Sequence, residues 1–190
     1  MNVLPDNLKE IVIYPRDYLI SKKALMPIYF EIDTHWNMLG ASYVADLLFE
    51  KIKKDFPNTL FPEIEYIMDV NYDSFGDIVP MSGFTSYGKT TIPDIHPKDG
   101  WSSYYTYIKN EGINGVIVEN KNQTLPKAII FRDSFFSALE PFTSTMFSSA
   151  EYNWRWFSES EKEYILQNKP DIIIWEVVER TISGIPNATW

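Results

Sequence analysis

The sequence has no cysteine and only two histidines among its 190 residues. The lack of cysteine excludes disulfide bonds, thiolate nucleophiles and cysteine-ligated zinc. With two histidines, a metal site would depend almost wholly on carboxylate ligands, so a metal enzyme is not favoured. We therefore expect neither a metal ion nor any other cofactor.

Basic residues are scarce as well. The chain has 17 Lys and Arg against 26 Asp and Glu, which gives a formal net charge of -9. Such a chain has little with which to neutralise phosphates, so we expect no nucleic-acid partner. Long hydrophobic runs are also missing, because Pro5, Pro15 and several charges interrupt the first part of the chain. No segment reads as a secretory signal or a membrane span.

What is present indicates a globular protein, since apolar residues make up 45% of the chain and aromatic residues 16%. The length predicts one domain over residues 1–190, and the alternation of predicted strands and helices predicts the α/β class. No internal repeat or linker indicates a second domain. Residues 57–126 are harder to assign, and the aromatic side chains in their loops either line a binding cleft or pack on the surface. The predicted strands are 11–14, 27–32, 115–120, 127–131 and 171–178, and the predicted helices are 38–56, 138–146 and 158–168.

An Asp-x-His pair, Asp33 and His35, follows the predicted strand 27–32 and precedes the predicted helix that begins at Met38. Both side chains would project from the end of the strand, which suits a general base held by an orienting acid. A helix N-terminus disfavours the imidazolium and would help to keep His35 neutral. A solvated loop is the simpler interpretation of one such triplet. The other histidine, His96, lies between prolines in an expected loop and is the weaker catalytic candidate.

Ser134 stands where the predicted strand 127–131 gives way to a helical pattern. A serine at such a turn has the geometry of a nucleophile elbow, with N–H groups nearby for an oxyanion. Serine is also a common helix cap, and taken alone that interpretation is the stronger one. Its neighbours Arg132 and Asp133 either contact substrate or form a structural ion pair with Glu179 or Arg180, and we favour the structural role. Near the C-terminus, the apolar run 171–178 predicts a central strand covered on both faces.

Several short motifs occur together in a fixed order. They are Asp33-Thr34-His35-Trp36-Asn37 with Gly40-Ala41, Gly76-Asp77-Ile78, Arg132-Asp133-Ser134-Phe135 and Glu176-Val177-Val178-Glu179-Arg180. Together they resemble the SGNH-hydrolase-like domain of the alginate O-acetyltransferase family, a group sometimes named for an Asp-His-His-Trp motif. The matches span residues 33 to 180, with Thr34 at the second position of that motif.

The resemblance implies a three-layer α/β/α sandwich with a mostly parallel sheet. It also implies acyl transfer with Ser134 as nucleophile, His35 as general base and Asp33 as its orienter, through an acetyl-serine intermediate. Asp33 and Ser134 should then end adjacent parallel strands, with His35 Nε2 about 2.6–3.2 Å from Ser134 Oγ. The candidate substrate-binding residues are Trp36, Asn37 and Arg132, although a tryptophan beside a helix start is more often part of the core.

Members of this family typically work outside the cytoplasm and acetylate exopolysaccharide beside a membrane acetyl-donor protein. The resemblance therefore implies a polysaccharide acceptor, a membrane acyl carrier protein as donor, and an extracytoplasmic location. Because the chain is short for the family domain, we expect an N-terminal part of that domain to be missing and the parent protein to be exported. Two alternatives stay open: a carbohydrate acetylesterase with the same triad, and a catalytically silent glycan-binding or assembly module.

Overall fold

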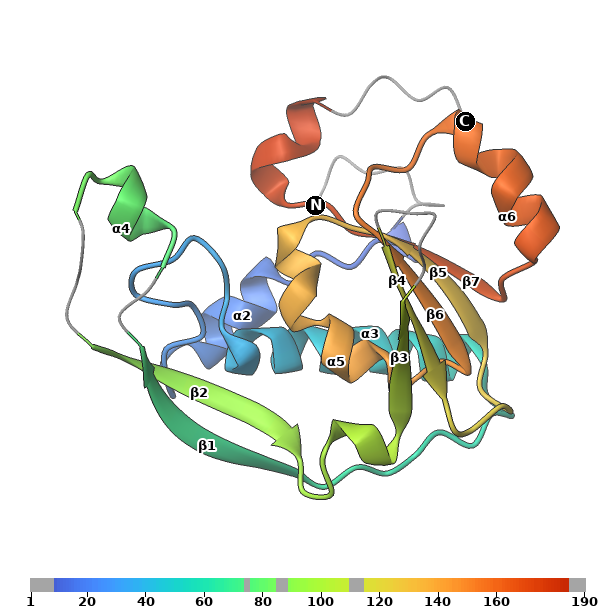
Figure 1. The fold of residues 1–190 in the computed structure, drawn as a ribbon, viewed down its shortest axis with the longest axis horizontal. Helices are drawn as coiled ribbons and strands as arrows, with labels where there is room; N and C mark the ends of the chain where they lie inside the picture. Colours follow the sequence, from blue (N-terminus) through green and yellow to red (C-terminus); the bar gives the residue numbers. More distant parts are fainter. Residues whose placement is uncertain (1–8, 74–75, 85–88, 110–114, 185–190) are drawn as a thin grey trace.

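The computed structural model describes residues 9–73, 76–84, 89–109 and 115–184 (Figure 1). Among these residues, no helix is both long enough and apolar enough to cross a membrane. The elements are, in chain order, α2 (Arg16–Lys22), α3 (Met38–Asp55), β1 (Tyr66–Asp73), α4 (Ile78–Met81), β2 (Thr90–Pro97), η1 (Trp101–Ser103), β3 (Tyr105–Lys109), β4 (Gly115–Asn120), β5 (Lys127–Phe131), η2 (Ser134–Ala138), α5 (Glu140–Thr143), β6 (Ser149–Asn153), η3 (Glu159–Glu161), α6 (Lys162–Asn168), β7 (Ile172–Trp175) and η4 (Glu179–Gly184).

The main sheet has five strands in the order β3-β4-β6-β5-β7. β5 runs parallel to both β6 and β7, whereas β4 runs antiparallel to β3 and β6. The α/β class predicted from the sequence is therefore correct, but the sheet is mixed and the expected sandwich with a mostly parallel sheet is not confirmed. One reason is that the connection from β3 to β4 is far shorter than the dozen or so residues that a parallel crossover requires.

Helices lie on both faces of this sheet (Figure 1). On one face, Tyr152 of β6 packs against Phe136 of η2, with ring centroids 5.9 Å apart. On the opposite face, Tyr164 of α6 donates a hydrogen bond to Glu151 of β6. Successive strand residues point to opposite faces, so neighbouring positions in β6 serve different helices. β5, the strand that leads to Ser134, is covered on both faces.

The strands β4 and β5 lie where the sequence predicts them, but β7 does not behave as expected. It is shorter than the predicted strand 171–178 and forms an edge of the sheet, where Ile173 is 45% exposed. An apolar run is compatible with an edge strand as well as a central one, so the run alone does not predict the position of β7 in the sheet. β6, which was not predicted, holds the centre of the sheet. β6 has polar residues at alternate positions, a pattern typical of a half-exposed strand, although the strand is almost wholly buried.

The expected strands 11–14 and 27–32 do not form. Residues 27–36 instead make a loop that folds back on itself, with an isolated bridge between Tyr29 and Trp36. The loop is held by Phe30 N–H donating to His35 O at 3.2 Å. Ile28 and Ile32 are both buried, so their apolar pattern reflects tertiary packing rather than pairing in a sheet. Asp33 therefore lies in a loop and not at the end of a strand.

The helix α3 begins at Met38, as predicted, and Asn37 is its N-cap. The Asn37 side chain accepts a hydrogen bond from Gly40 N at 3.0 Å and donates one to Pro27 O at 2.8 Å. A β-carbon on Gly40 would lie 2.2 Å from Ile28 O, so only glycine permits this close approach of helix and loop. Asn37 is 1% exposed, and its side chain joins the helix start to the preceding loop, so the structure does not support the predicted contact with substrate.

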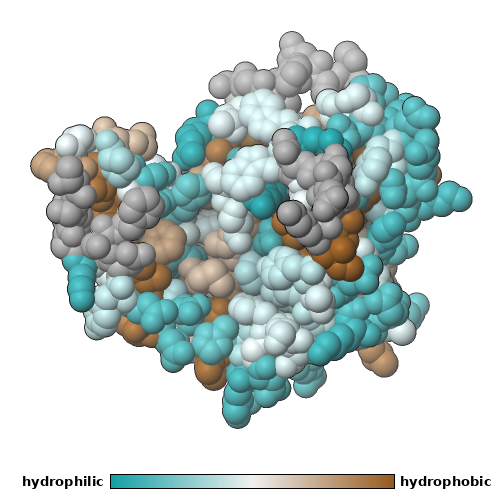
Figure 2. All heavy atoms as spheres, in the orientation of Figure 1, coloured by the Kyte–Doolittle hydropathy of each residue, from teal (hydrophilic) through white to brown (hydrophobic). Residues whose placement is uncertain are grey.

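Residues 66–97 contain a feature that was not predicted, a two-stranded antiparallel sheet of β1 and β2 outside the main sheet. His96 lies on β2 rather than in a loop, and its Nε2 is 3.0 Å from Asp69 of β1. In the view of Figure 2, the surface is hollowed between the part of the molecule that carries β1, β2 and α4 and the part built around the main sheet. Further along, Trp101 packs edge-on against Phe142, which supports surface packing for this aromatic segment.

We predict that Asn37→Ala lowers the free energy of unfolding by about 1–3 kcal/mol, since it removes a helix cap and leaves the buried Gly40 N–H without a partner. Denaturant titration measures this change. Ser158→Ala is the matched control: the sequence predicts a capping box there, but Ser158 makes no side-chain cap hydrogen bond before α6. A loss in the control as large as that of Asn37→Ala would contradict the assignment.

Candidate active site

The Asp33 carboxylate organises the loop 27–36. Its Oδ1 accepts hydrogen bonds from the His35 backbone N–H at 2.9 Å and lies 2.6 Å from His35 Nδ1, and its Oδ2 accepts one from Asp77 N at 3.1 Å. Burial alone would raise the pKa of Asp33, but these hydrogen bonds from His35 and Asp77 outweigh it and hold the pKa below its ordinary value. The carboxylate therefore stays ionised and fixes the orientation of the imidazole.

A second segment, Gly76-Asp77, supports this loop from the side. Asp77 Oδ1 accepts a hydrogen bond from Thr34 N at 2.7 Å, and its Oδ2 accepts one from Thr34 Oγ1 at 2.5 Å. A β-carbon on Gly76 would lie 2.1 Å from Ile32 O, so glycine is required for the two segments to meet. Sequence reasoning noted Gly76-Asp77 only as a motif and missed its role in holding the loop.

Potential ligand atoms of Asp33, His35 and Asp77 lie within 4.8 Å of one another, close enough in distance to share a cation. The Asp33 oxygens already accept N–H groups, and both Asp77 oxygens bind Thr34. This pattern of donors matches a network that orients the histidine better than it matches a metal site, since a bound cation would compete with each of these hydrogen bonds.

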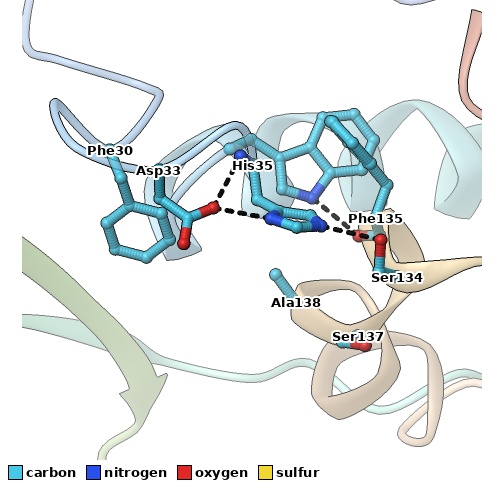
Figure 3. A pocket seen from close by; sticks show the side chains of 8 residues that line it. Phe30, Asp33, His35, Ser134, Phe135, Ser137 and Ala138 are labelled. Atoms are coloured by element: carbon cyan, nitrogen blue, oxygen red, sulfur yellow. Dashed lines mark hydrogen bonds and ion pairs between the residues drawn. The ribbon is translucent and has the colours of Figure 1, made fainter. Parts of the chain in front are cut away.

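Ser134 is the first residue of η2, directly beyond β5. Asp133 caps this 3-10 helix, with Oδ1 accepting a hydrogen bond from Phe135 N at 2.8 Å. The Ser134 hydroxyl points towards His35, and Oγ lies 2.7 Å from Nε2 (Figure 3). The distance expected from the sequence is therefore confirmed across 99 residues of chain, although His35 comes from a loop and not from a neighbouring strand. The catalytic roles of Ser134, His35 and Asp33 stay predictions.

Trp36 joins the histidine loop to the serine segment. Its Nε1 donates a hydrogen bond to Phe135 O at 2.8 Å, and the two rings meet edge to face with centroids 5.2 Å apart. The Phe135 ring also lies 4.7 Å from the His35 ring. Trp36 is buried. Its place between the two segments supports the core interpretation of this residue over the predicted sugar-stacking role.

The serine turn is braced from the other side by the chain that follows β7. The Asp133 N–H donates to Glu176 Oε2 at 3.0 Å, and Asp133 Oδ2 accepts from Val178 N at 2.7 Å. Each of the two segments therefore supplies a carboxylate that holds the backbone of the other. Burial, together with the nearby Asp133 charge, raises the pKa of Glu176 to about 7. The sequence signal for this brace was Glu176 at the end of the apolar run.

Arg132 is buried beside the site and makes contacts within the protein. Its Nη1 donates to Ser137 Oγ at 2.8 Å, and its Nη2 forms an ion pair with Glu140 Oε2 at 3.2 Å. The structural role favoured from the sequence therefore fits, but the partner is Glu140 rather than Glu179. Since the guanidinium is committed to these partners, the structure does not support the predicted direct contact of Arg132 with substrate.

Ser134 and His35 face a small pocket of about 300 Å³. Its mixture of a polar centre and an aromatic wall is suited to a small acyl group beside the hydroxyl. Phe30, Ser137 and Ala138 were not identified as pocket residues from the sequence. Of these, only Ser137 could have been inferred, because it lies one helical turn after Ser134. The lining residues are Phe30, Asp33, His35, Trp36, Ser134, Phe135, Ser137 and Ala138 (Figure 3).

Together, these observations describe an α/β protein with a mixed sheet, helices on both of its faces, and a continuous chain of contacts from Ser134 through His35 to Asp33. No protein-family model and no curated protein sequence matches the chain. Solved structures do match in fold. PatB1 of Bacillus cereus superposes with a TM-score of 0.60 at 18% identity, over 90% of this chain and 75% of PatB1.

Two further structures share the fold. A DHHW family protein of Eubacterium siraeum matches with a TM-score of 0.59 at 16% identity, over 90% of this chain and 72% of that protein. The O-acetyltransferase domain of Pseudomonas putida AlgJ matches with a TM-score of 0.50 at 15% identity, over 89% of this chain and 61% of that chain. At these identities the comparisons establish the common fold, which agrees with the fold group that the sequence motifs resemble.

We predict that Glu176→Gln removes a pH-dependent part of the stability. The folded protein keeps the Glu176 proton up to about pH 7, whereas an unfolded glutamate releases it near its ordinary pKa of 4.5. The folded state thus binds more protons between these values, so the free energy of unfolding of the wild type falls as pH rises through about 4.5 to 7.

The Gln variant stays neutral and its stability should fall less over the same range, as measured by denaturant titration at stepped pH. Glu163→Gln, at an exposed position on α6, serves as the control and should keep the wild-type slope. Identical pH profiles for Glu176→Gln and the wild type would show that Glu176 does not carry the extra proton.

Proposed function

We propose that this chain is an O-acetyltransferase that transfers acetyl groups to polysaccharide hydroxyls through an acetyl-serine intermediate. The observation that carries the proposal is the chain of contacts from Ser134 Oγ to His35 Nε2 at 2.7 Å and from His35 Nδ1 to Asp33 Oδ1 at 2.6 Å. A serine hydroxyl is a poor nucleophile at neutral pH, and an imidazole placed in this way can take its proton.

In the first half-reaction, Ser134 Oγ attacks the carbonyl carbon of the acetyl donor while His35 Nε2 removes the hydroxyl proton. Collapse of the tetrahedral intermediate breaks the bond to the leaving group, which takes the proton from His35, and acetyl-serine remains. Asp33 holds the imidazole in the required tautomer and stabilises its charged form. The Ser134 backbone N–H, at the first position of η2, is the expected donor to the oxyanion.

In the second half-reaction, a sugar hydroxyl attacks the acetyl carbonyl. His35 takes the proton of that hydroxyl and returns it to Ser134 Oγ as the acetyl group leaves. The pocket of about 300 Å³ has room for an acetyl group on Ser134 and for one attacking hydroxyl. The fold shared with the AlgJ O-acetyltransferase domain supports the choice of acetyl transfer.

The proposal includes the setting of the reaction. The acceptor is an extracellular or cell-wall polysaccharide, the donor is an acetyl group presented by a membrane acyl carrier protein, and the site of action lies outside the cytoplasm. These features follow from the motif resemblance and define the assay: the donor can be replaced by a small acetyl ester, and the acceptor by an oligosaccharide.

We predict that Ser134→Ala abolishes the acetyl-enzyme and lowers turnover of a small acetyl ester by about 10³-fold or more, because no other atom replaces the attacking Oγ. Intact-protein mass spectrometry after mixing with the ester reports the adduct directly. Ser137→Ala is the matched variant in the same pocket and should still be acetylated at Ser134. An adduct of equal yield in Ser134→Ala would refute the assignment of the nucleophile.

A carbohydrate acetylesterase is the second candidate, since His35 and Asp33 keep 25% and 22% of their side-chain surface exposed, which admits water to the acetyl-serine. The two functions differ only in the acceptor. With an acetyl ester and increasing oligosaccharide, a transferase should form acetylated sugar at the expense of free acetate. An esterase should release acetate at a rate that the sugar does not change.

A further inference from the structure

A half-exposed tryptophan lies close to the proposed catalytic pocket and has no part in the triad. Trp154 is 52% exposed and follows β6 directly. The Arg132 guanidinium carbon lies 4.2 Å from the centroid of its ring system. The exposed part of the indole is therefore accessible for contact with a ligand.

The position of Trp154 follows from the register of the sheet. β5 and β6 are parallel, and Phe131 is paired with Asn153. Trp154 is therefore level with Arg132 at the carboxyl edge of the sheet, the same edge on which Ser134 follows β5. Arg132 also donates to Ser137 Oγ, and Ser137 lines the catalytic pocket. Arg132 therefore contacts both the Trp154 indole and a residue of the pocket wall.

The indole rests on a support that is itself fixed. Arg132 is 7% exposed, and its guanidinium binds Ser137 Oγ, Glu140 Oε2 and Asp133 O. Stacking on a planar guanidinium held in this way limits the motion of the ring, so little side-chain entropy remains to be lost when a ligand binds. The charge of Arg132 is balanced by Glu140, which leaves a flat apolar surface rather than a site for an anion.

We propose that Trp154 is an acceptor subsite that stacks against a sugar ring of the polysaccharide while a neighbouring ring presents its hydroxyl to Ser134. This rests on the proposed function. A pyranose ring presents an apolar face of C–H groups, which complements an accessible aromatic face, and its hydroxyls remain in water. Because the Arg132 charge is already paired, binding is by stacking and changes little with salt.

The experiment separates acceptor binding from acylation. Trp154→Ala in the full chain should lower kcat/KM for the oligosaccharide in acetyl transfer by about tenfold, as expected for the loss of one stacked aromatic contact. Formation of the acetyl-enzyme from a small ester, measured without sugar, should fall far less. Trp154→Phe should restore most of the transfer. Trp156→Ala, at a tryptophan two residues further on that is 38% exposed, is the control and should match the wild type.

The probes are tetramers of β-1,4-linked glucose, N-acetylglucosamine and uronic acid, used first in direct calorimetric binding and then in transfer at low and high salt. Equal losses of acylation and transfer in Trp154→Ala would overturn the proposal, because Trp154 would then act through Arg132 on the serine turn. Wild-type binding to none of the three probes would also overturn it. If the wild type binds sugar but forms no acetyl-enzyme, and Trp154→Ala loses the sugar binding, the subsite is supported and the proposed acetyl transfer is refuted.

Discussion

The ionised carboxylate of Asp33 is the constraint on which the histidine side of the site depends. It gathers the His35 ring, the His35 backbone and the backbone of Asp77 around one group, although these come from two segments more than forty residues apart. A carboxylate with several N–H partners is stabilised in its charged form, and each partner loses its hydrogen bond if the charge is removed. The same group therefore shapes the loop and orients the His35 imidazole.

The serine side is built by a different device. Asp133 and Glu176 each hold the backbone of the other's segment, so the turn after β5 is tied to the chain after β7. This brace exists because β5 and β7 are parallel and adjacent, which brings their carboxyl ends to one edge. Trp36 then connects the two sides through Phe135. The alignment of Ser134 with His35 therefore depends on these contacts as well as on Asp33.

Local patterns in the sequence were sufficient for part of this structure. The helical spacing of α3, the apolar strand β5 and the helix before Pro170 were predicted because periodicity and flanking prolines report them directly. Residues 27–32 were wrongly predicted to form a strand, since apolar residues such as Ile28 and Ile32 give the same pattern in a strand and in a packed loop. The positions of β6 and β7 within the sheet depend on pairing between distant residues, which no local pattern reveals.

The candidate site was found through spacing and motif order rather than through secondary structure. Asp33, His35 and Ser134 meet as expected, even though the strand assumed beneath Asp33 does not exist. The structure does not support the predicted substrate contacts of Asn37 and Arg132, for a common reason. A polar residue beside a site looks available in a sequence, and only the structure shows that its terminal groups already bind within the protein, as the Asn37 amide does at the helix start and both Arg132 Nη atoms do beside Glu140.

The pair of hydrogen bonds between Thr34 and Asp77 bears on how such a site can change during evolution. One of the two is donated by the Thr34 backbone N–H, a group that every residue except proline possesses. The Thr34 side chain adds only the second donor. Most of the other links around the loop also use backbone atoms. A scaffold fastened largely by its main chain tolerates extensive replacement of side chains while its geometry persists, so lineages that share this architecture can drift apart until little but the spacing of a few polar residues still relates them.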